Sequence, residues 1–556
     1  MMDNLHLQYC KEVFDENGVL TSFEPVYPHN FNFAYDVVDA FAQKDPNRRA
    51  LVWCNEQGEE RIFSFGELKS LSDRTAAVLQ KAGVKKGDRV MLILKRHYQF
   101  WYVITALMKL GAIVIPATNL LTKKDLVYRF EAAGITTIVC TGEGEVPQHV
   151  LDAAKEYPAL ANKFMVRGKN PGFVDLDEEI AASDGMFSKP ETLADDPMLL
   201  YFTSGTTGYP KMVIHDNTYA IGHMITAKHW QNIPSDGLHL TVSETGWGKA
   251  VWGKLYGQWF LGAGVFVYDF EKFSAGDLLH KIEKYGITSF CAPPTIYRFF
   301  IKEGMGGYDL SSLKYATVAG EALNPEVFNR FYEYTGLKLM EGFGQTETTL
   351  LIANLAGTTP KPGSMGKPSP LFHVDLVNED GSSVSTGEVG EIVVRTTDKK
   401  QVGLFMGYYR DENRTKEAWH DGMYHTGDTA WRDEDGYFWY VGRTDDVIKA
   451  SGYRIGPFEI ESVLMEHPAV LECAVTGAPD PIRGQVVKAT IVLTKSYSPS
   501  DALAKELQQY VKKQTAPYKY PRIVEFVPEL PKTISGKIRR VQIRQESENK
   551  AKESAQ

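Results

Sequence analysis

The chain has 556 residues, which is too long for one hydrophobic core, so at least two domains are expected. Its residues are 43% hydrophobic and 24% charged, as in ordinary soluble globular proteins. The net charge of −9 argues against a nucleic-acid partner, which normally requires a basic surface. Five cysteines stand far apart without a Cys-x-x-Cys pair, which favours reduced thiols over disulfides or a zinc site.

The N-terminal segment shows no targeting pattern. The first 18 residues contain four acidic residues and one lysine, which fits neither a secretory signal nor an Arg-rich transit peptide. No apolar run approaches the roughly 18 residues of a membrane span. These features predict a cytoplasmic protein without a membrane span, and they leave oligomer formation open.

Helical and strand-like segments alternate between residues 30 and 200. Apolar residues recur at helical spacing over 65–82 and 100–110, whereas 88–94, 111–116 and 135–140 are short apolar runs typical of buried strands. Such alternation predicts an α/β fold with a parallel sheet covered by helices.

A loop rich in glycine and hydroxyl groups follows the strand-like run 199–202 and ends at a lysine. Its glycines allow backbone N–H groups to converge on one point, its hydroxyls add donors, and the lysine supplies a positive charge. The loop predicts a polyphosphate site, although an ordinary surface turn would use the same residue types. No glycine directly precedes the lysine, so this is not a Walker loop. The residues concerned are Thr203, Ser204, Gly205, Thr206, Thr207, Gly208 and Lys211.

The α/β pattern continues after this loop. A strand over 212–216 leads to Asn217, which is expected to cap a helix reaching about Trp230. Further strands are expected over 287–292, 315–319 and 337–340, with helices over 294–302 and 324–334 between them. Polar loops follow two of these strands, at 320–322 and 341–347. In open α/β sheets, ligands bind beyond the carboxyl ends of the strands.

The last third of the chain predicts two further units. Residues 366–442 have an all-β rhythm and predict a small β-subdomain. We place the boundary between a large N-terminal domain (1–444) and a smaller α+β C-terminal domain (445–556) at Asp445. The latter is expected to contain helices over 457–465 and 501–512 and strands over 471–476 and 486–493. The tail from Glu546 is almost entirely polar, which predicts disorder.

Three charged residues are weak signals when each is taken alone. Asp428 follows a tight polar turn, where it suits two ribose hydroxyls or is a plain solvated carboxylate. Arg443, beside the proposed boundary, could reach the same sugar or a phosphate. Lys537 lies on a Gly/Ser turn flanked by proline, where a lysine is usually only a surface charge.

The order and spacing of five segments resemble the adenylate-forming superfamily, which includes acyl-CoA synthetases, luciferases and peptide-synthetase adenylation domains. The segments are 201–211, 341–347, 424–428, 442–452 and 531–537, and the resemblance covers about residues 30–544. Within the superfamily, residues 246–247, 290–294 and 451–459 are most similar to the medium-chain acyl-CoA synthetases. Met212 departs from the glycine of many members, and the medium-chain branch commonly lacks that glycine too.

The resemblance implies a two-step reaction that uses ATP, Mg²⁺ and CoA. A carboxylic acid and ATP would give acyl-AMP and pyrophosphate, and CoA would then give acyl-CoA and AMP. Lys537, Thr346 and Glu347 would be catalytic, with Mg²⁺ on Glu347 and Thr206. The nucleotide would contact the glycine-rich loop and Lys537, together with Gly320, Glu321, Ala322, Glu341, Gly342, Phe343, Gly344, Gln345, Thr346, Asp428, Arg443 and Arg454.

The resemblance also implies a mobile C-terminal domain that swings about Asp445 between the two steps. CoA would then pass along Ser451, Gly452 and Tyr453, with Arg483 on a CoA phosphate. Candidate walls of the acyl pocket are Trp230, Trp247, Lys249 and Trp252. Plain core packing explains each tryptophan about as well, and short- to medium-chain, branched and aromatic acids all fit such a pocket.

Three other functions use some of the same residues. A ligase that passes the activated acid to a carrier protein would keep every ATP residue. A phosphotransferase or NTPase lacks its usual Walker spacing here, and a non-catalytic nucleotide-binding regulator would not need Lys537, Glu347 and Asp428 together.

Overall fold

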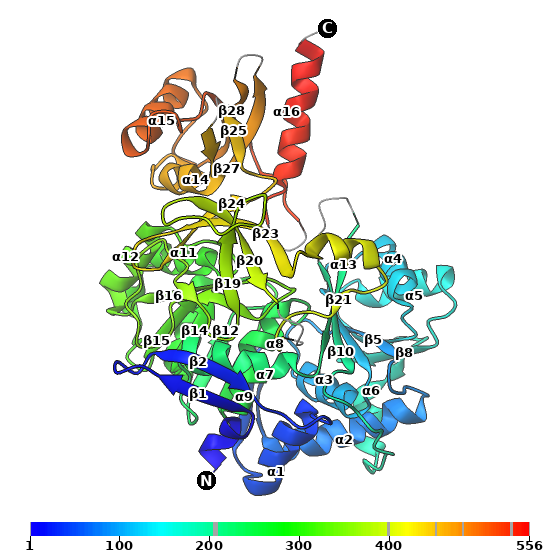
Figure 1. Cartoon of the computed structure of the whole chain (residues 1–556). Coiled ribbons are helices and arrows are strands. Elements are labelled where there is room, and N and C mark those ends of the chain that lie inside the picture. Colours follow the sequence, from blue (N-terminus) through cyan, green and yellow to red (C-terminus); the bar gives the residue numbers. More distant parts are fainter. Residues whose placement is uncertain are drawn as a thin grey trace.

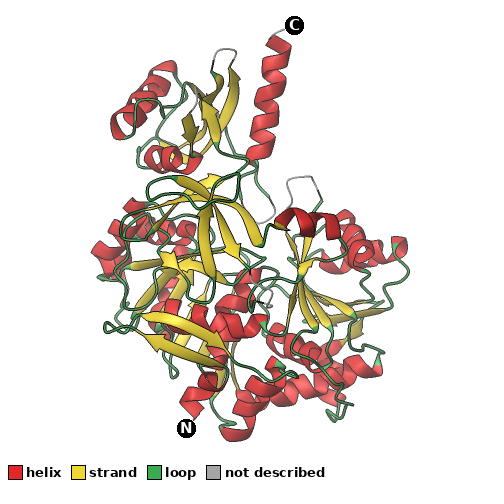
Figure 2. Cartoon of the chain, in the orientation of Figure 1, coloured by secondary structure: helices red, strands yellow, loops and turns green. Residues whose placement is uncertain are grey.

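The computed structural model describes residues 2–203, 209–396, 401–450, 453–480, 483–533 and 537–554. Two large sheets with helices packed against them form the body of the molecule, and a smaller C-terminal unit sits on one side of it (Figures 1 and 2). At the N-terminus, η1 (Met2–Gln8) precedes a hairpin of β1 (Cys10–Phe14) and β2 (Leu20–Pro25). Along the described chain, no helix is both long and apolar enough to cross a membrane.

The first large sheet has eight strands in the order β21-β11-β10-β6-β5-β7-β8-β9. The strands from β10 to β9 are paired in parallel, and β11 and β21 are added antiparallel at one edge. Their bounds are β5 (Arg89–Ile93), β6 (Ile113–Pro116), β7 (Thr137–Thr141), β8 (Asn162–Val166), β9 (Val174–Asp175), β10 (Pro197–Thr203), β11 (Lys211–Asp216) and β21 (Gly407–Tyr408). The helices in this part of the chain are η2 (Ala34–Asp39), α1 (Ala40–Lys44), α2 (Phe65–Lys81), α3 (Gln99–Lys109), α4 (Lys123–Ala133), α5 (Val146–Glu156) and α6 (Leu176–Ala182).

The second large sheet has nine strands in the order β18-β17-β16-β15-β14-β12-β13-β3-β4. Its central strands are parallel, with antiparallel strands at both edges. Their bounds are β3 (Arg49–Asn55), β4 (Glu60–Ser64), β12 (Leu238–Thr241), β13 (Gly264–Asp269), β14 (Ser289–Ala292), β15 (Tyr315–Val318), β16 (Leu339–Gly344), β17 (Leu350–Ala353) and β18 (Lys367–Pro368). The helices here are α7 (Tyr219–Met224), η3 (Ile225–Trp230), α8 (Gly248–Lys254), α9 (Tyr256–Phe260), α10 (Ala275–Tyr285), α11 (Pro294–Glu303), η4 (Met305–Gly307) and α12 (Pro325–Thr335).

Two smaller sheets complete the fold. A five-stranded antiparallel sheet contains β19 (His373–Val377), β20 (Val389–Arg395), β22 (Trp419–His420), β23 (Met423–Arg432) and β24 (Phe438–Arg443), with α13 (Glu412–Ala418) beside it. The C-terminal unit contains β25 (Ile448–Ala450), β26 (Tyr453–Ile455), β27 (Val470–Asp480), β28 (Gly484–Leu493) and β29 (Ile523–Phe526), with α14 (Pro457–Met465), α15 (Asp501–Gln514) and α16 (Arg540–Ser554). The predicted α/β class is confirmed: parallel-rich sheets, a β-subdomain and a smaller α+β C-terminal unit.

Local sequence signals explain several helix starts. The Ser64 side chain accepts from the Glu67 N–H, and the Glu67 carboxylate in turn accepts from the Ser64 N–H, which closes a capping box at the start of α2. Asn324 caps α12 as predicted, because its side-chain oxygen accepts from the Glu326 N–H. Asn217 does not cap the helix after β11. That helix begins after Thr218, and the Asn217 amide donates to the Leu193 carbonyl instead.

Three other expectations differ from the structure. The segment 341–344 is not a loop, because β16 extends to Gly344 and pairs with β17. The β-subdomain is not a closed unit, since β18 and β21 inside its predicted range complete the two large sheets. The tail from Glu546 is helical and lies in α16, where Lys488 donates to the Ser547 hydroxyl and Lys550 pairs with Glu525. Polar contacts thus order a helix that has almost no apolar face.

Candidate active site

The predicted phosphate loop connects the antiparallel strands β10 and β11. Thr203 and Lys211 face each other across this pair, and the predicted residues Ser204, Gly205, Thr206, Thr207 and Gly208 lie outside the described residues. The Lys211 ammonium lies 3.4 Å from the Tyr408 hydroxyl and borders an open cleft. Burial lowers the pKa of Lys211, and the Glu347 carboxylate acts against this shift.

Tyr408 joins the phosphate loop to the candidate metal ligand. Its hydroxyl donates to Glu347 Oε1 at 2.9 Å, and the Glu347 carbonyl accepts from the Phe405 N–H. Lys211, Tyr408 and Glu347 therefore form one continuous polar chain. The sequence reasoning missed Tyr408, because no local pattern shows that β21 adds to the edge of β11.

Glu347 fits a magnesium site of the kind completed by substrate. Within the described ranges, no group of three or more His, Cys, Asp or Glu residues could hold a metal by itself. Mg²⁺ is typically bound by one or two carboxylates together with substrate phosphates. A single buried carboxylate beside a phosphate loop matches that donor set.

The predicted ribose pair comes together on two neighbouring strands. Asp428 on β23 and Arg443 on β24 are paired in register, and the Arg443 guanidinium lies 3.5 Å from the Asp428 carboxylate. Asp428 is 5% exposed and accepts from the Tyr440 hydroxyl at 3.0 Å. Burial raises the pKa of Asp428, and the charges of Arg443 and Lys537 act against it.

The Gln345 side chain holds Asp428 in place through a hydrogen bond. Its side-chain NH₂ donates to the Asp428 carboxylate and to the Thr426 carbonyl, while its carbonyl oxygen accepts from the Tyr424 hydroxyl. The backbone next to it is fixed as well, since the Thr346 carbonyl lies 2.7 Å from Nε2 of buried His215. The 345–347 segment therefore contacts Asp428 through Gln345 and contributes Glu347 to the polar chain with Tyr408.

The two predicted nucleotide-framing segments are bound to each other by Glu341. Its Oε1 accepts from the Leu323 N–H at 3.1 Å, directly after the 320–322 loop. Burial raises the pKa of Glu341 to about 8, and its Oε2 accepts no hydrogen bond from the described part of the chain. Glu341 thus fixes the end of the 320–322 loop through this hydrogen bond. Glu321 is half-exposed and lies 3.9 Å from Arg298.

Three of the four candidate acyl-pocket residues lie together beside this loop. Trp230 is fully buried, its indole N–H donates to the Met340 carbonyl at 3.0 Å, and its ring lies 5.9 Å from that of Trp252. The ammonium of Lys249 donates to the Ala319 carbonyl at 2.5 Å and lies 5.7 Å from the Trp252 ring. Burial lowers the pKa of Lys249, and the charge of Lys537 adds to the shift. Trp247 immediately precedes α8, with no described ring or hydrogen-bond contact from its side chain to the other three.

The backbone around these residues allows very close packing. Gly320 has φ +110°, and a Cβ there would lie 3.1 Å from the Lys249 ammonium. A Cβ on Gly342 would lie 2.6 Å from the Trp230 ring, which real Cβ atoms do not approach. Glycine at 342 is therefore required by the indole that covers it.

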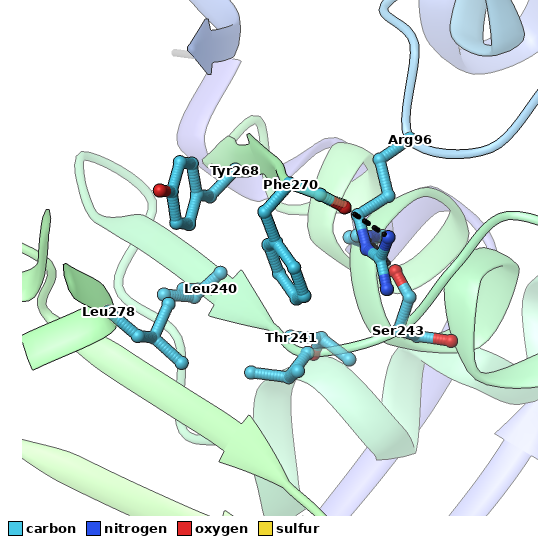
Figure 3. A pocket seen from close by; sticks show the side chains of 9 residues that line it. Arg96, Leu240, Thr241, Ser243, Tyr268, Phe270 and Leu278 are labelled. Atoms are coloured by element: carbon cyan, nitrogen blue, oxygen red, sulfur yellow. Dashed lines mark hydrogen bonds between the residues drawn. The ribbon is translucent and has the colours of Figure 1, made fainter. Parts of the chain in front are cut away.

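A second cavity lies between Arg96, Phe270 and Lys254, and Trp230, Lys249 and Trp252 do not line it (Figure 3). Arg96 stacks 4.0 Å over the Phe270 ring and donates to the Phe270 carbonyl, and Lys254 donates to the Ser243 carbonyl. Burial lowers the pKa of Lys254 to about 7. Among the predicted site residues that the structure describes, none lines this cavity.

The catalytic lysine predicted by resemblance lies on the C-terminal unit. Lys537 is exposed, its N–H donates to the Thr533 hydroxyl, and its carbonyl accepts from the Thr533 N–H. Its charge acts on both Asp428 and Lys249, so the nucleotide and acyl sides share one electrostatic environment.

The predicted CoA residues are less completely described. Ser451 and Gly452 lie outside the described residues, as does the side chain of Arg454, which was predicted on the nucleotide side. Tyr453 is 50% exposed and stacks on Tyr518 at 4.1 Å. The Arg483 N–H donates to the Asp480 carboxylate. In the described chain, no contact joins Tyr453 or Arg483 to the nucleotide-side residues.

Asp445, the predicted hinge, lies between two arginines. Arg443 approaches it at 3.8 Å from the N-terminal side, and Arg544 on α16 approaches it at 3.8 Å from the C-terminal unit. Arg544 also pairs with the neighbouring Asp446. The ribose pair and the proposed hinge are therefore joined through Arg443.

Known proteins match this chain over nearly its whole length. The family described as AMP-binding enzyme matches residues 38–409, and the AMP-binding enzyme C-terminal domain matches residues 459–537. Acyl-coenzyme A synthetase ACSM4 of Homo sapiens, a mitochondrial protein, is 44% identical over 524 residues, 92% of this chain and 90% of that protein. Acyl-coenzyme A synthetase ACSM3 of Pongo abelii, also mitochondrial, is 41% identical over 528 residues, 93% of this chain and 90% of that protein.

A solved structure agrees with the sequence relatives. The anthranilate CoA ligase AuaEII in complex with anthranoyl-AMP superposes with a TM-score of 0.86 at 27% identity, covering 94% of this chain and 99% of that one. The resemblance to the adenylate-forming enzymes that the sequence motifs predict is thereby confirmed. The chain belongs to the AMP-binding enzyme family, and within that family to the acyl-coenzyme A synthetases.

Proposed function

We propose that this protein joins a carboxylic acid to CoA in two steps, with ATP converted into AMP and pyrophosphate. The observation that carries the proposal is the grouping of Lys211, Glu347 and Asp428 with the charge of Lys537. In this proposal, Lys211 offers a cation for the polyphosphate and Asp428 offers a buried acceptor for the ribose. Lys537 offers an ammonium group for the reacting carboxylate.

In the first step, Lys211 and the loop before it would hold the β- and γ-phosphates. Glu347 would hold Mg²⁺ against the same phosphates, and the metal supplies charge neutralisation for the pyrophosphate that leaves. Tyr408, which donates to Glu347, would keep that carboxylate oriented toward the phosphates.

Asp428 would accept the two ribose hydroxyls, and Thr346 would donate its side-chain hydroxyl to the α-phosphate. The support for Asp428 is its burial beside donors from Tyr440 and Gln345, which hold its carboxyl group in one orientation. Hydrogen bonds to a charged, preorganised acceptor are stronger than neutral ones.

Lys537 would bridge the attacking carboxylate and the α-phosphate. Two such anions at about 4 Å repel each other by about 4 kcal/mol at an effective dielectric constant of about 20. An ammonium between them cancels that repulsion where charge develops in the transition state.

In the second step, the C-terminal domain (445–556) would swing about Asp445, withdraw Lys537 and present another face. Ser451, Gly452 and Tyr453 would then line the path of the CoA thiol, and Arg483 would meet a CoA phosphate. This proposal is supported by the position of Asp445 between arginines of the two units. Rotation of a domain about a few residues is a common way to exchange catalytic groups.

The acid is proposed to be short- to medium-chain, branched or aromatic. Trp230 and Trp252, whose tilted rings lie 5.9 Å apart beside Lys249, would limit its length. A structural neighbour is an anthranilate CoA ligase and another is a benzoate CoA ligase, which supports aromatic acids as candidates. The cytoplasmic location stays a proposal too, because the curated relatives are mitochondrial proteins.

A panel of acids tests the function. Each acid is incubated with ATP, Mg²⁺ and the purified chain, with and without CoA, and AMP, ADP and the thioester are measured. CoA-dependent AMP and thioester formation is expected for at least one acid. AMP release that needs a carrier protein, ADP as product, or no turnover with any acid would instead favour the carrier ligase, the phosphotransferase or the regulator.

A further inference from the structure

The indole that forms one wall of the proposed acyl pocket stands at the end of a π-helix. η3 (Ile225–Trp230) closes with a bond from the Gln231 N–H to the Thr226 carbonyl, five residues back. π-helical turns are rare and occur frequently at functional sites, because they rotate the residues that follow relative to an α-helix. The orientation of Trp230 therefore depends on what keeps this turn wound.

The N-terminal hairpin holds that turn from outside. Glu12 on β1 is within 2.6 Å of the Lys228 ammonium and 2.7 Å of His229 Nε2, the two residues before Trp230. Its side chain is only 4% exposed although the hairpin lies at the edge of the body (Figure 1). Burial raises the pKa of Glu12, but hydrogen bonds from His229 and Lys228 outweigh burial and lower it to about 2. The carboxylate is thus ionised and fully engaged with η3.

The opposite side of the same turn is fixed to the second large sheet. The His229 carbonyl accepts from the Ala356 N–H at 2.6 Å, just after β17, and the Trp230 indole donates to Met340 on β16. Glu12 and the sheet therefore hold the last turn of η3 between them. The Lys228 ammonium also lies 2.7 Å from Nε2 of His6, so Glu12 shares the outer side of this turn with a residue of η1.

The indole has little space in which to move while the turn is held. Its ring lies against Gly342 so closely that no Cβ fits there, and it faces Trp252. A buried amide pair extends the same constraint, because Gln258 donates to both the Gln231 side chain and the Trp252 carbonyl. The two indoles are thereby positioned as one wall.

We propose that Glu12 is a positioning residue for acyl selection: by holding Lys228 and His229 it fixes the end of η3 and with it the Trp230 indole. The proposal rests on the proposed function, because it takes Trp230 as a wall of the acyl pocket. It adds a residue more than 200 positions upstream, in a hairpin that contacts no reacting group. Loss of the Glu12 contacts to Lys228 and His229 is expected to let the Trp230 indole shift, so that the pocket admits longer acids.

The expected effect is a change in selectivity rather than in overall activity. One additional buried methylene corresponds to about a 4-fold difference in binding. If the wall yields enough to admit one or two methylenes, the ratio of kcat/KM for octanoate to that for butanoate should rise about 5- to 15-fold. Such a ratio does not depend on the fraction of enzyme that is folded.

The experiment compares Glu12→Gln and Glu12→Ala with a matched control on the same hairpin. Glu24→Ala removes another carboxylate of the hairpin, whose 3.2 Å pair with Lys11 is exposed and does not contact η3. Trp230→Phe tests the pocket wall directly. For each variant, kcat and KM are measured separately for butanoate, hexanoate, octanoate and ATP. Thermal unfolding is followed in parallel, since removing one partner of a buried ion pair also destabilises the fold.

The proposal expects a graded result. Glu12→Ala should raise the octanoate ratio most and Glu12→Gln less, because glutamine still accepts from His229, while Glu24→Ala and all ATP KM values stay at the wild-type level. An equal loss of kcat/KM for every acid in both Glu12 variants would overturn it, since that outcome describes a purely structural residue. If Trp230→Phe shifts the ratio but the Glu12 variants do not, the pocket wall stands and only Glu12 is wrong. If Trp230→Phe also leaves the ratio unchanged, the pocket assignment itself fails.

Discussion

The ribose side and the lysine side of the site are built in opposite ways. Asp428 is 5% exposed and held by Tyr440, Gln345 and Arg443, all on neighbouring segments of the N-terminal body. Lys537 and Tyr453 are exposed and are carried by the C-terminal unit. A group needed in both half-reactions can be locked in place, whereas groups needed in only one must be able to leave. The contrast in burial fits the proposed exchange of catalytic groups by a moving C-terminal domain.

Removing the Lys537 side chain should impair the adenylation step and leave the ribose side of the site intact. Lys537→Ala is expected to lower the rate of acid-dependent pyrophosphate–ATP exchange by roughly 10³-fold, because about 4 kcal/mol of repulsion is no longer cancelled. Exchange of labelled pyrophosphate into ATP measures this step alone.

The same variant should still convert supplied acyl-AMP and CoA into thioester at close to the wild-type rate. Lys211→Ala, in the N-terminal body, serves as the comparison because it removes a lysine that should not move between steps. An equal loss of both half-reactions in Lys537→Ala would mean that Lys537 is not specific to adenylation.

Stiffening the proposed hinge should have the opposite effect. Proline at 445 fixes φ near −65° and restricts the residue before it, so Asp445→Pro is expected to spare pyrophosphate exchange and to reduce thioester formation by at least about 10²-fold. Asp445→Asn is the matched control, since it removes the contacts to Arg443 and Arg544 but leaves the backbone free. Survival of both half-reactions in the proline variant would place the hinge elsewhere.

Many strands and helices of the fold could be predicted from local sequence, because short apolar runs indicate buried strands and turn residues indicate helix ends. The helix over 457–465 has the predicted bounds, and Asn324 caps α12 as expected. Gln345 and Glu347 follow directly after β16 in a polar segment that the sequence shows. Those features need only a few neighbouring residues to define them. Asp428, in contrast, lies inside β23 rather than after a turn, and only the resemblance implied its role.

What could not be predicted depends on partners far away in the chain. Two glycines made 341–344 resemble a loop, but Gly342 is there because Trp230, 112 positions upstream, leaves no room for a Cβ. Tyr408 reaches Glu347 only because β21 pairs with β11. The tail from Glu546 was expected to be disordered from its polarity, yet Lys488 and Glu525 on neighbouring strands hold it through Ser547 and Lys550.

The buried ribose side of the site can be tested with a substitution of similar size. Asp428→Asn keeps the size of the side chain and removes its charge, so the ATP KM is expected to rise about 10- to 100-fold, as for loss of hydrogen bonds to a charged group. Tyr440→Phe removes one donor to the same carboxylate and should raise the ATP KM by only about 5-fold. The acid KM should stay unchanged in both. A parallel rise in the acid and ATP KM values would show that Asp428 supports the fold rather than the ribose.

A pH profile tests the carboxyl group that accepts from the Leu323 N–H, directly after the 320–322 loop. Glu341 has its pKa raised by burial from 4.5 to about 8, so between these values the folded state keeps a proton that the unfolded chain has lost. Stability contributed by this proton is present at low pH and is lost as pH rises, by at most about 1.4 kcal/mol per pH unit. Glu341→Gln cannot lose a proton and still accepts from the Leu323 N–H. Its unfolding temperature relative to wild type should therefore increase steadily from pH about 5 to pH about 8. Parallel pH profiles for the two proteins would mean that Glu341 is already ionised in the folded state, and then the loop would be held by a charge rather than by a neutral acid.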